Sequence, residues 1–313
     1  MRVSVRRVYA NPALFGFAAA GVLWLATVVA AGGRGGYDTM AVALSFAIFA
    51  VTVGTGQMFV IASGPGNIDL SSPAILTLAA YVAMDAMHGS NVLLPLGLLL
   101  ALGVGVVAGV VNHTLIRGFS IPPIIATLAS SFGLQSLAMN AGGESTIKPP
   151  SLLADFTVLH LLGVQVLLVL GIAGSVVAQI VVGRTIFGRH LLAAGQNERA
   201  AELSGVRATR LRLAAYVISG ALAGLAGFLL AGFTGGAALN MGDSYLMESV
   251  AIAVLGGTSV AGGRANAIGI WGAALFLSLL TTLLNASGVS AGWRFILSGL
   301  TIIAVVSAAT EPT

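Results

Sequence analysis

Residues 244–266 read SYLMESVAIAVLGGTSVAGGRAN, and this stretch decides the fold class. A short apolar run, Ser244–Leu255, is followed by a Gly-rich polar segment, Gly256–Asn266, before the next apolar run begins. A helix that crosses a bilayer needs about 20 mostly apolar residues, so Ser244–Leu255 is too short for a full crossing. Irregular backbone is tolerated at membrane depth only where protein shields it. We therefore expect a broken or re-entrant segment at this point of a helical membrane protein.

The composition of the whole chain supports this expectation. Of its 313 residues, 57% are hydrophobic and 8% are charged, whereas soluble domains carry about 25% charged residues. The apolar runs are long rather than short and alternating, which excludes a transmembrane β-barrel. The 42 glycines suit helices that pack closely through small residues. The sequence predicts an all-α membrane protein with a single transmembrane domain over residues 1–313.

About ten apolar segments are candidate membrane-spanning helices. They are Leu14–Ala31, Met40–Ala62, Pro73–Met87, Val92–Leu115, Ile121–Met139, Leu161–Val182, Leu213–Gly232, Ser244–Leu255, Ala267–Leu284 and Phe295–Ala309. Pro73–Met87 is also too short for a comfortable crossing, and it follows a second Gly-rich break, Gly64–Ser72. The two breaks lie in halves of similar layout. Transporters built from inverted repeats show this symmetry, with the solute path at the broken helices.

The basic residues give the chain an orientation. With about ten crossings, both termini lie on the same side as the longest polar loop, residues 184–212. All but three of the 14 basic residues fall on that side, the exceptions being Arg34, Lys148 and Arg294. The positive-inside rule makes the crowded side cytoplasmic. We expect a multi-pass membrane protein with both termini in the cytoplasm. Its pI near 10.0 has the same topological cause, so nucleic acid is not expected as a partner.

The central loop contains a short sequence with helical character. Residues 188–206 read GRHLLAAGQNERAAELSGV. Ala, Leu, Glu and Arg favour a helix at Glu198–Leu203, and Asn197 is suited to cap its N-terminus. Gly205 is suited to end the helix. A short capped helix beneath the bundle can push against another protein; the alternative is an ordinary positively charged loop.

Small residues recur at helical spacing in two of the candidate spans. The repeats are Gly103-x-Gly105-x-x-x-Gly109 and Gly220-x-x-x-Gly224-x-x-Gly227. Repeats of this kind let helix backbones approach closely. They predict helix-packing faces without a role in transport.

Several segments, in order, resemble those of one family. Residues 188–206 look like the ATPase-contacting loop of ABC-importer permeases of the ribose, xylose and arabinose type. Residues 121–128 (IPPIIATL) are similar to that family's entry to its fifth helix, and residues 68–71 (IDLS) match the turn after its second. Residues 254–263 (VLGGTSVAGG) match its most characteristic Gly-rich segment, and residues 288–290 (GVS) follow at a suitable distance. The resemblance spans essentially the whole chain.

The resemblance implies a type II ABC importer permease fold of about ten helices in the inner (plasma) membrane of a bacterium. It further implies that the chain works as a dimer with a second copy or a paralogue. It also implies two cytoplasmic ATPase subunits and an exoplasmic (periplasmic) solute-binding protein as partners, beside the membrane lipid. The chain lacks a Gly-x-x-x-x-Gly-Lys-Ser/Thr phosphate loop. The ATPase is therefore a separate polypeptide, ATP and Mg belong to that partner, and no cofactor or metal is expected in this chain. The family's coupling role is carried to Gly188, Arg189, Gly195, Asn197, Ala200, Ala201, Ser204 and Gly205.

The residues expected along the translocation path lie at the two breaks and near helix ends. They are Asn67, Asp69, Ser71, Thr127, Glu248, Gly256, Gly257 and Thr258. Asp69 is expected to accept hydrogen bonds from backbone amides of its own turn, the alternative being direct contact with a passing hydroxyl compound. Glu248 has Arg264 as a candidate ion-pair partner. The family's usual turn carries glycine where this chain has Asn67, and Pro73 also departs from it, which leaves the solute open.

Two other functions, secondary transport and intramembrane catalysis, need charged or reactive side chains within the membrane, and this sequence has few of them. A secondary transporter driven by protons or sodium would need an acidic or histidine relay at mid-membrane, for which Asp85 and Glu248 are the main candidates. An intramembrane enzyme would need a nucleophile–base constellation or a metal pair, and no catalytic residues are recognised. Within the importer hypothesis, the solute could be a pentose, a hexose, a polyol, a furanose signal or a nucleoside.

Overall fold

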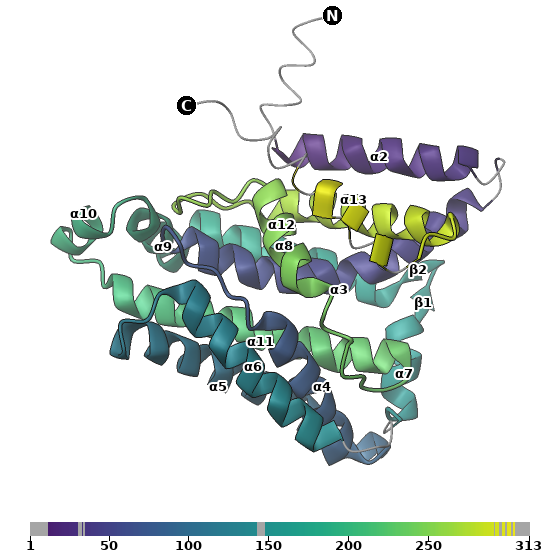
Figure 1. The fold of residues 1–313 in the computed structure, drawn as a ribbon, viewed down its shortest axis with the longest axis horizontal. Coiled ribbons are helices and arrows are strands. Elements are labelled where there is room, and N and C mark those ends of the chain that lie inside the picture. Colours follow the sequence, from purple (N-terminus) through teal and green to yellow (C-terminus); the bar gives the residue numbers. More distant parts are fainter. Residues whose placement is uncertain are drawn as a thin grey trace, which may run out of the picture.

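The computed structural model describes residues 12–30, 33, 35–142 and 148–290, with scattered positions between 292 and 303. Over these residues the chain is a bundle of helices with one small two-stranded hairpin (Figure 1), which confirms the all-α prediction. The elements are α2 (Pro12–Ala30), α3 (Gly36–Ala62), α4 (Ser72–Met87), η1 (Asn91–Leu93), α5 (Leu94–Gly118), α6 (Pro123–Gly142), α7 (Ser151–Val158), β1 (His160–Leu161), β2 (Val164–Gln165), α8 (Val166–Arg184), α9 (Ile186–Gln196), α10 (Glu198–Leu203), α11 (Ala208–Thr234), α12 (Tyr245–Leu255) and α13 (Ala267–Ala286).

Six helices in this part of the chain are long and apolar enough to cross a membrane. They cover Gly36–Ala62, Asn91–Gly118, Pro123–Ala141, Val166–Arg184, Ala208–Thr234 and Ala267–Ala286. Three shorter apolar helices cover Leu14–Val29, Ser72–Met87 and Tyr245–Leu255. The last predicted span, Phe295–Ala309, lies largely outside the described residues. The chain is therefore a multi-pass helical membrane protein, and the number of about ten crossings stays a prediction.

One predicted span begins later than expected. The apolar segment was expected to cross from Leu161, but residues 160–165 form the β1–β2 hairpin and α8 begins at Val166. Leu161 pairs with Val164 across the hairpin. Leu162 and Gly163 form its turn with positive φ angles of 53° and 79°, which is the geometry that tight two-residue hairpins require. This local turn overrides the apolar composition.

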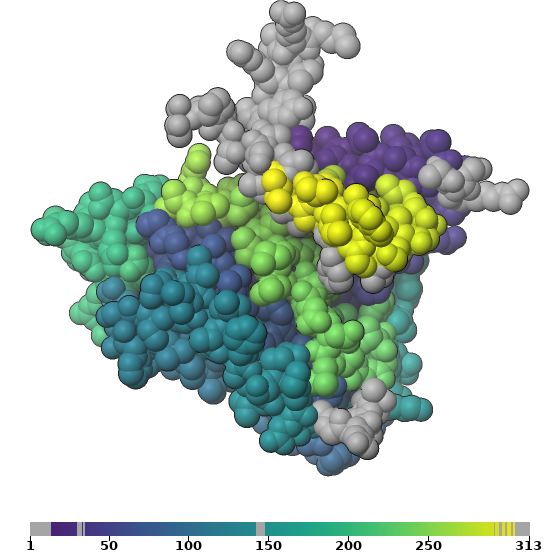
Figure 2. Space-filling view, in the orientation of Figure 1, coloured from purple at the N-terminus to yellow at the C-terminus, as the bar shows by residue number. Residues whose placement is uncertain are grey.

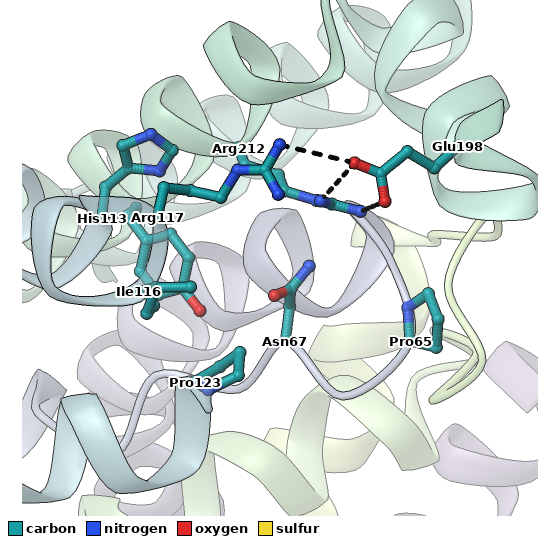
Figure 3. A pocket seen from close by; sticks show the side chains of 9 residues that line it. Pro65, Asn67, His113, Ile116, Arg117, Pro123, Glu198 and Arg212 are labelled. Atoms are coloured by element: carbon teal, nitrogen blue, oxygen red, sulfur yellow. Dashed lines mark hydrogen bonds and ion pairs between the residues drawn. The ribbon is translucent and has the colours of Figure 1, made fainter. Parts of the chain in front are cut away.

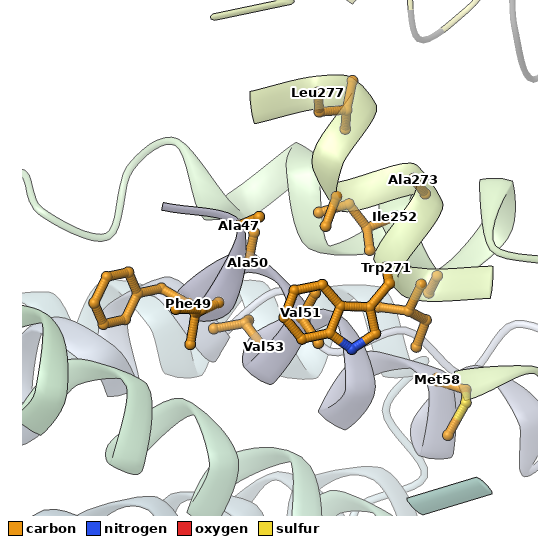
Figure 4. Packing of buried hydrophobic residues seen from close by; sticks show 14 of the residues in the cluster. Ala47, Phe49, Ala50, Val51, Val53, Met58, Ile252, Trp271, Ala273 and Leu277 are labelled. Atoms are coloured by element: carbon orange, nitrogen blue, oxygen red, sulfur yellow. The ribbon is translucent and has the colours of Figure 1, made fainter. Parts of the chain in front are cut away.

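The core of the bundle lies around α3. In its most apolar window, 78% of the α3 residues are buried, against 28% for η1–α5, 17% for α6 and 22% for α8. Helices α12 and α13 cover α3 with apolar side chains such as Ile252 and Trp271 (Figure 4). The indole Nε1 of Trp271 donates to the Ser175 hydroxyl at 2.8 Å, so this buried polar atom is satisfied. The exposed apolar faces of α5, α6 and α8 suit contact with lipid.

The predicted small-residue faces are confirmed as helix contacts except at Gly103, which is exposed and has nothing within 4 Å of an added Cβ. A Cβ added at Gly105 would meet the backbone of Gly220, and one added at Gly109 would meet that of Tyr216. Helices α5 and α11 therefore touch backbone to backbone. Because lipid is as apolar as the side chains, such close packing is a main source of helix association in membranes.

Candidate coupling and translocation site

The predicted helix in the central loop is present with the predicted bounds. Helix α10 spans Glu198–Leu203, and the Asn197 Oδ1 accepts a hydrogen bond from the Ala200 N–H at 3.0 Å. Gly205 ends the helix with a φ of 84°, the left-handed conformation that favours glycine. Figures 1 and 2 show α9 and α10 at one edge of the bundle, where α10 projects outward. We call this the loop end.

The eight residues predicted to couple to an ATPase divide into two groups by exposure. Those on the surface are Arg189, Asn197, Ala200, Ser204 and Gly205. The buried ones are Gly188, Gly195 and Ala201. Ala201 packs against Ala194 and Ala208, while a Cβ at Gly195 would meet the carbonyl oxygen of Ala62. The buried group holds the loop on the bundle, and only the exposed group is free to meet a partner.

Leu203 was not singled out from the sequence, although it is the most exposed apolar residue of α10. Its exposed fraction is 84%. A large apolar side chain at the end of a polar loop is the signal that sequence reasoning could have used. It adds an apolar tip to the exposed surface of α10.

An ion pair ties α10 to the transmembrane helices. The Arg212 guanidinium on α11 donates to both carboxylate oxygens of Glu198, at 2.7 and 2.8 Å. Arg117, in the last turn of α5, approaches the same carboxylate at 3.9 Å (Figure 3). The hydrogen bond from Arg212 holds the pKa of Glu198 below its ordinary value. No periodic pattern connects these residues in the sequence, so the ion pair was missed.

The first break, between α3 and α4, runs from the loop end into the bundle. A Cβ at Gly64 would lie 3.0 Å from the Arg212 guanidinium. Five residues later, the Asp69 carboxylate accepts a hydrogen bond from the Ser219 hydroxyl at 2.9 Å. Arg212 and Ser219 are both on α11, about 10 Å apart at the rise of an α-helix. The chain therefore penetrates the bundle by roughly that depth before α4 begins.

Asp69 is the centre of a buried hydrogen-bond network. Its Oδ1 accepts from the Ser71 N–H at 3.0 Å and from the Ser71 hydroxyl at 2.6 Å. The Asn112 amide donates to the Ser71 hydroxyl at 2.7 Å and accepts from the Ser130 hydroxyl at 2.6 Å. Together with Ser219, the network connects the first break to α5, α6 and α11. The prediction that Asp69 accepts from its own turn is confirmed.

Two more side chains fix the backbone of the same break. The Thr127 hydroxyl on α6 accepts from the Leu70 N–H at 3.1 Å. The Gln57 amide on α3, oriented with its oxygen toward the Asp69 N–H, makes hydrogen bonds to the backbone N–H and C=O of Asp69, both at 3.2 Å. The Asn67 amide donates to the Ser63 hydroxyl at 3.1 Å. The predicted residues Asn67, Asp69, Ser71 and Thr127 are thus brought together at one break.

The predicted residues of the second break occupy a different position. Gly256 packs against the backbone of Gly269, Gly257 has a φ of 101°, and Thr258 is buried. No hydrogen bond joins them to the Asp69 network within the part of the chain that the structure describes. The break returns to the loop end, where the Gly263 N–H donates to the Ala62 carbonyl at 3.0 Å.

Glu248 does not pair with Arg264. Neither an ion pair nor a side-chain hydrogen bond of Glu248 occurs among the described residues. The reason is the length of α12, since Glu248 lies in its first turn and Arg264 follows its opposite end. The helix between Glu248 and Leu255 alone covers about 10 Å.

The two short helices begin close together inside the bundle. A Cβ at Gly242, just before α12, would meet the carbonyl oxygen of Pro73 and the hydroxyl of Thr77 in the first turns of α4. Helix α4 has 16 residues and α12 has 11, which correspond to about 24 and 16 Å. Both are shorter than the roughly 30 Å of a hydrocarbon core. Two short helices that begin near each other inside a multi-pass bundle resemble the discontinuous helices that form solute sites in membrane transporters.

Comparisons with known proteins place the chain in a family. Residues 39–306 match the family described as branched-chain amino acid transport system / permease component, and the chain belongs to this family. It is 30% identical over 285 residues to the fructose import permease protein FrcC of Rhizobium meliloti, covering 86% of this chain and 77% of the relative. It is 32% identical over 254 residues to the ribose import permease protein RbsC of Bacillus subtilis, covering 80% and 78%.

A further relative is named for the import of autoinducer 2. The chain is 34% identical over 242 residues to the autoinducer 2 import system permease protein LsrC of an Enterobacter species, covering 77% of this chain and 70% of the relative. No solved structure matches the chain.

Proposed function

We propose that this chain is the membrane-spanning permease subunit of an ATP-binding-cassette importer for a small sugar or sugar-like solute. The single observation that carries the coupling part of the proposal is α10, a capped helix that projects from the loop end. Its first residue, Glu198, is tied to α11 through Arg212 at 2.7 Å. A force on α10 is therefore transmitted to a transmembrane helix.

The solute class follows from the relatives and from the chemistry at the first break. The relatives bear the names of fructose, ribose and autoinducer 2 import permeases. Apart from Asp69, the first break is built from neutral hydroxyls and amides, a chemistry that suits a polyol better than an ion. Ser71, Asn112 and Ser219 are themselves buried within the network. Asp69 itself is 1% exposed, and its carboxylate already accepts hydrogen bonds from Ser71 and Ser219. Its role is to hold the break in place, and the solute meets neighbouring neutral groups.

The path is proposed to pass where α4 and α12 begin. Discontinuous helices near the membrane midplane form the solute sites of many transporters. Gly242 next to Pro73 and Thr77 supports this position, because it brings the two helix starts into contact. In this proposal both breaks are re-entrant segments of a type II permease fold with about ten crossings.

The partners in this proposal lie on both sides of the membrane. Two ATPase subunits, which carry ATP and Mg, meet α10 of each permease in the cytoplasm. A solute-binding protein delivers the solute from outside, and a second permease completes the dimer. Both termini lie on the ATPase side.

The coupling role is tested by a charge placed at the tip of α10. The variant Leu203→Asp is co-expressed with the ATPase subunit of the same transport system, and co-purification is quantified against the natural chain. Burial of a leucine side chain contributes about 1.5–3 kcal/mol, so we expect at least a tenfold weaker complex. The matched control is Leu162→Asp, because Leu162 is 96% exposed and lies in the β1–β2 hairpin rather than in the loop.

Co-purification, together with a solute-uptake assay in vesicles, separates the importer from the gradient-driven alternative. Unchanged co-purification of Leu203→Asp would refute the role of α10. Solute uptake by ATPase-free vesicles would favour a secondary transporter. Asp85, one of the candidate relay groups for that alternative, is exposed in the last turn of α4.

A further inference from the structure

A polar cavity lies behind α10 at the loop end. Its volume is about 240 Å³. It is bounded by the start of the first break, the C-terminal end of α5 and the first residue of α6 (Figure 3). The first residue of α10 and the N-terminal part of α11 complete its wall. Its charged and polar lining consists of Asn67, His113, Arg117, Glu198, Arg212 and Tyr216. The cavity is not part of the Asp69 network or of the exposed surface of α10.

Positive charge exceeds negative charge in this cavity. Arg117 and Arg212 come from two different helices, and Glu198 is the one acidic residue of the lining. Glu198 binds Arg212 at 2.7 Å but lies 3.9 Å from Arg117. The Arg117 guanidinium also donates a hydrogen bond to the Thr209 hydroxyl, at 2.9 Å. The positive charge of Arg117 is therefore incompletely neutralised by the carboxylate of Glu198.

Two buried polar atoms on residues of the lining have no hydrogen-bond partner within the described residues. They are the His113 Nδ1 and the Tyr216 hydroxyl. His113 is 9% exposed and Tyr216 is 1% exposed. Buried polar atoms are almost always hydrogen-bonded, so each exception calls for an explanation. These two residues leave unsatisfied hydrogen-bonding capacity in the wall of the cavity.

We propose that the cavity is a binding site for a small anion that carries a phosphate group. A guanidinium matches phosphate in bidentate geometry, and the pairing of Arg with phosphate is a charge-assisted hydrogen bond. The anion competes with the Glu198 carboxylate for Arg212 and engages Arg117 at the same time. Because Glu198 is the first residue of α10, occupancy loosens the connection between α10 and α11. This regulatory consequence rests on the proposed coupling function, whereas the binding site itself does not.

The test measures binding of inorganic phosphate to the purified chain in nanodiscs of neutral phosphatidylcholine. Isothermal titration calorimetry is performed at constant ionic strength. We expect saturable binding to the natural chain, loss of binding in Arg212→Gln, and about tenfold tighter binding in Glu198→Gln, since the competing carboxylate is gone. The control is Arg210→Gln, because Arg210 is exposed on the same helix and does not line the cavity.

The two key variants make the result decisive. Arg212→Gln and Glu198→Gln break the same ion pair, so a merely structural role predicts the same change in both. Opposite changes in phosphate affinity support the site. Absence of binding in both the natural chain and Glu198→Gln would show a water-filled cavity and overturn the proposal.

The source of the phosphate is identified by a second arm. The titration is repeated in nanodiscs that contain phosphatidylglycerol. If the affinity for soluble phosphate falls as the phosphatidylglycerol fraction rises, the site takes an anionic lipid headgroup. If the affinity is unchanged, the site takes a soluble phosphate compound.

Discussion

Gly220 offers a quantitative test of how α5 and α11 associate. In Gly220→Ala, the new Cβ would collide with the carbonyl oxygen of Gly105 on the facing helix. The two backbones would have to separate along a contact that also includes Gly109 and Gly224. Overpacking of this kind costs about 1–3 kcal/mol.

The same substitution also stabilises the helix itself, and a control variant measures this contribution separately. Replacing a helical glycine by alanine stabilises a helix by about 0.5–1 kcal/mol. Gly174 in α8 is exposed, and nothing lies within 4 Å of a Cβ added there. Gly174→Ala should therefore show the favourable effect alone. The two variants should differ in unfolding free energy by about 1–3 kcal/mol, which is the overpacking cost itself.

The measurement is an SDS titration in mixed micelles, followed by circular dichroism at the helical band. We expect the transition of Gly220→Ala at a lower SDS fraction than in the natural chain, and that of Gly174→Ala at an equal or higher one. Equal transitions of the two variants would show that backbone contact between α5 and α11 does not contribute to stability.

Three further predictions concern the loop end and the Asp69 network. The folded-state pKa of Glu198 lies below its ordinary value of 4.5, so the Arg212 pair stabilises α10 above that pH and is lost as the pH falls through the lowered pKa. Amide exchange in α10, corrected for its intrinsic rate, should accelerate in acid for the natural chain and not for Glu198→Gln. Asn197→Ala removes the cap of α10 and should cost about 1 kcal/mol, seen as roughly fivefold faster exchange there, whereas Asn197→Ser should not. Asp69→Ala leaves the Ser71 and Ser219 hydroxyls without their acceptor and should cost about 2 kcal/mol or more in the SDS titration; a loss as small as that of an exposed carboxylate would contradict the network.

The parts of the structure that sequence reasoning predicted correctly are those with local causes. Helix α10 was predicted with its exact limits because its start depends on Asn197, three residues from the N–H that it caps, and its end on Gly205. The small-residue faces were predicted for a similar reason, since Gly105 and Gly109 repeat at the spacing of one helix face. Each of these features can be recognised from a few neighbouring residues, without knowledge of the rest of the chain.

The parts that were missed depend on contacts between distant segments. Nothing near Asp69 in the sequence indicates that it binds Ser219, and nothing near Glu198 indicates that Arg212 is its partner. The candidate pairing of Glu248 with Arg264 does not form, because α12 separates the two residues. Charge complementarity alone does not fix a partner, since the packing of helices decides which side chains meet.

The hydrogen bond between Asp69 and Ser219 also determines when, during synthesis of the chain, the first break can reach its final structure. Ser219 lies 150 residues further along the chain than Asp69. A ribosome adds about 5–20 residues per second, so roughly 8–30 s separate the synthesis of the two. During that interval the carboxylate has Ser71 as a partner but not α11. The first break therefore reaches its final anchorage only after the second half of the chain has entered the membrane, and a stalled or truncated product would carry an incompletely fixed carboxylate in its interior.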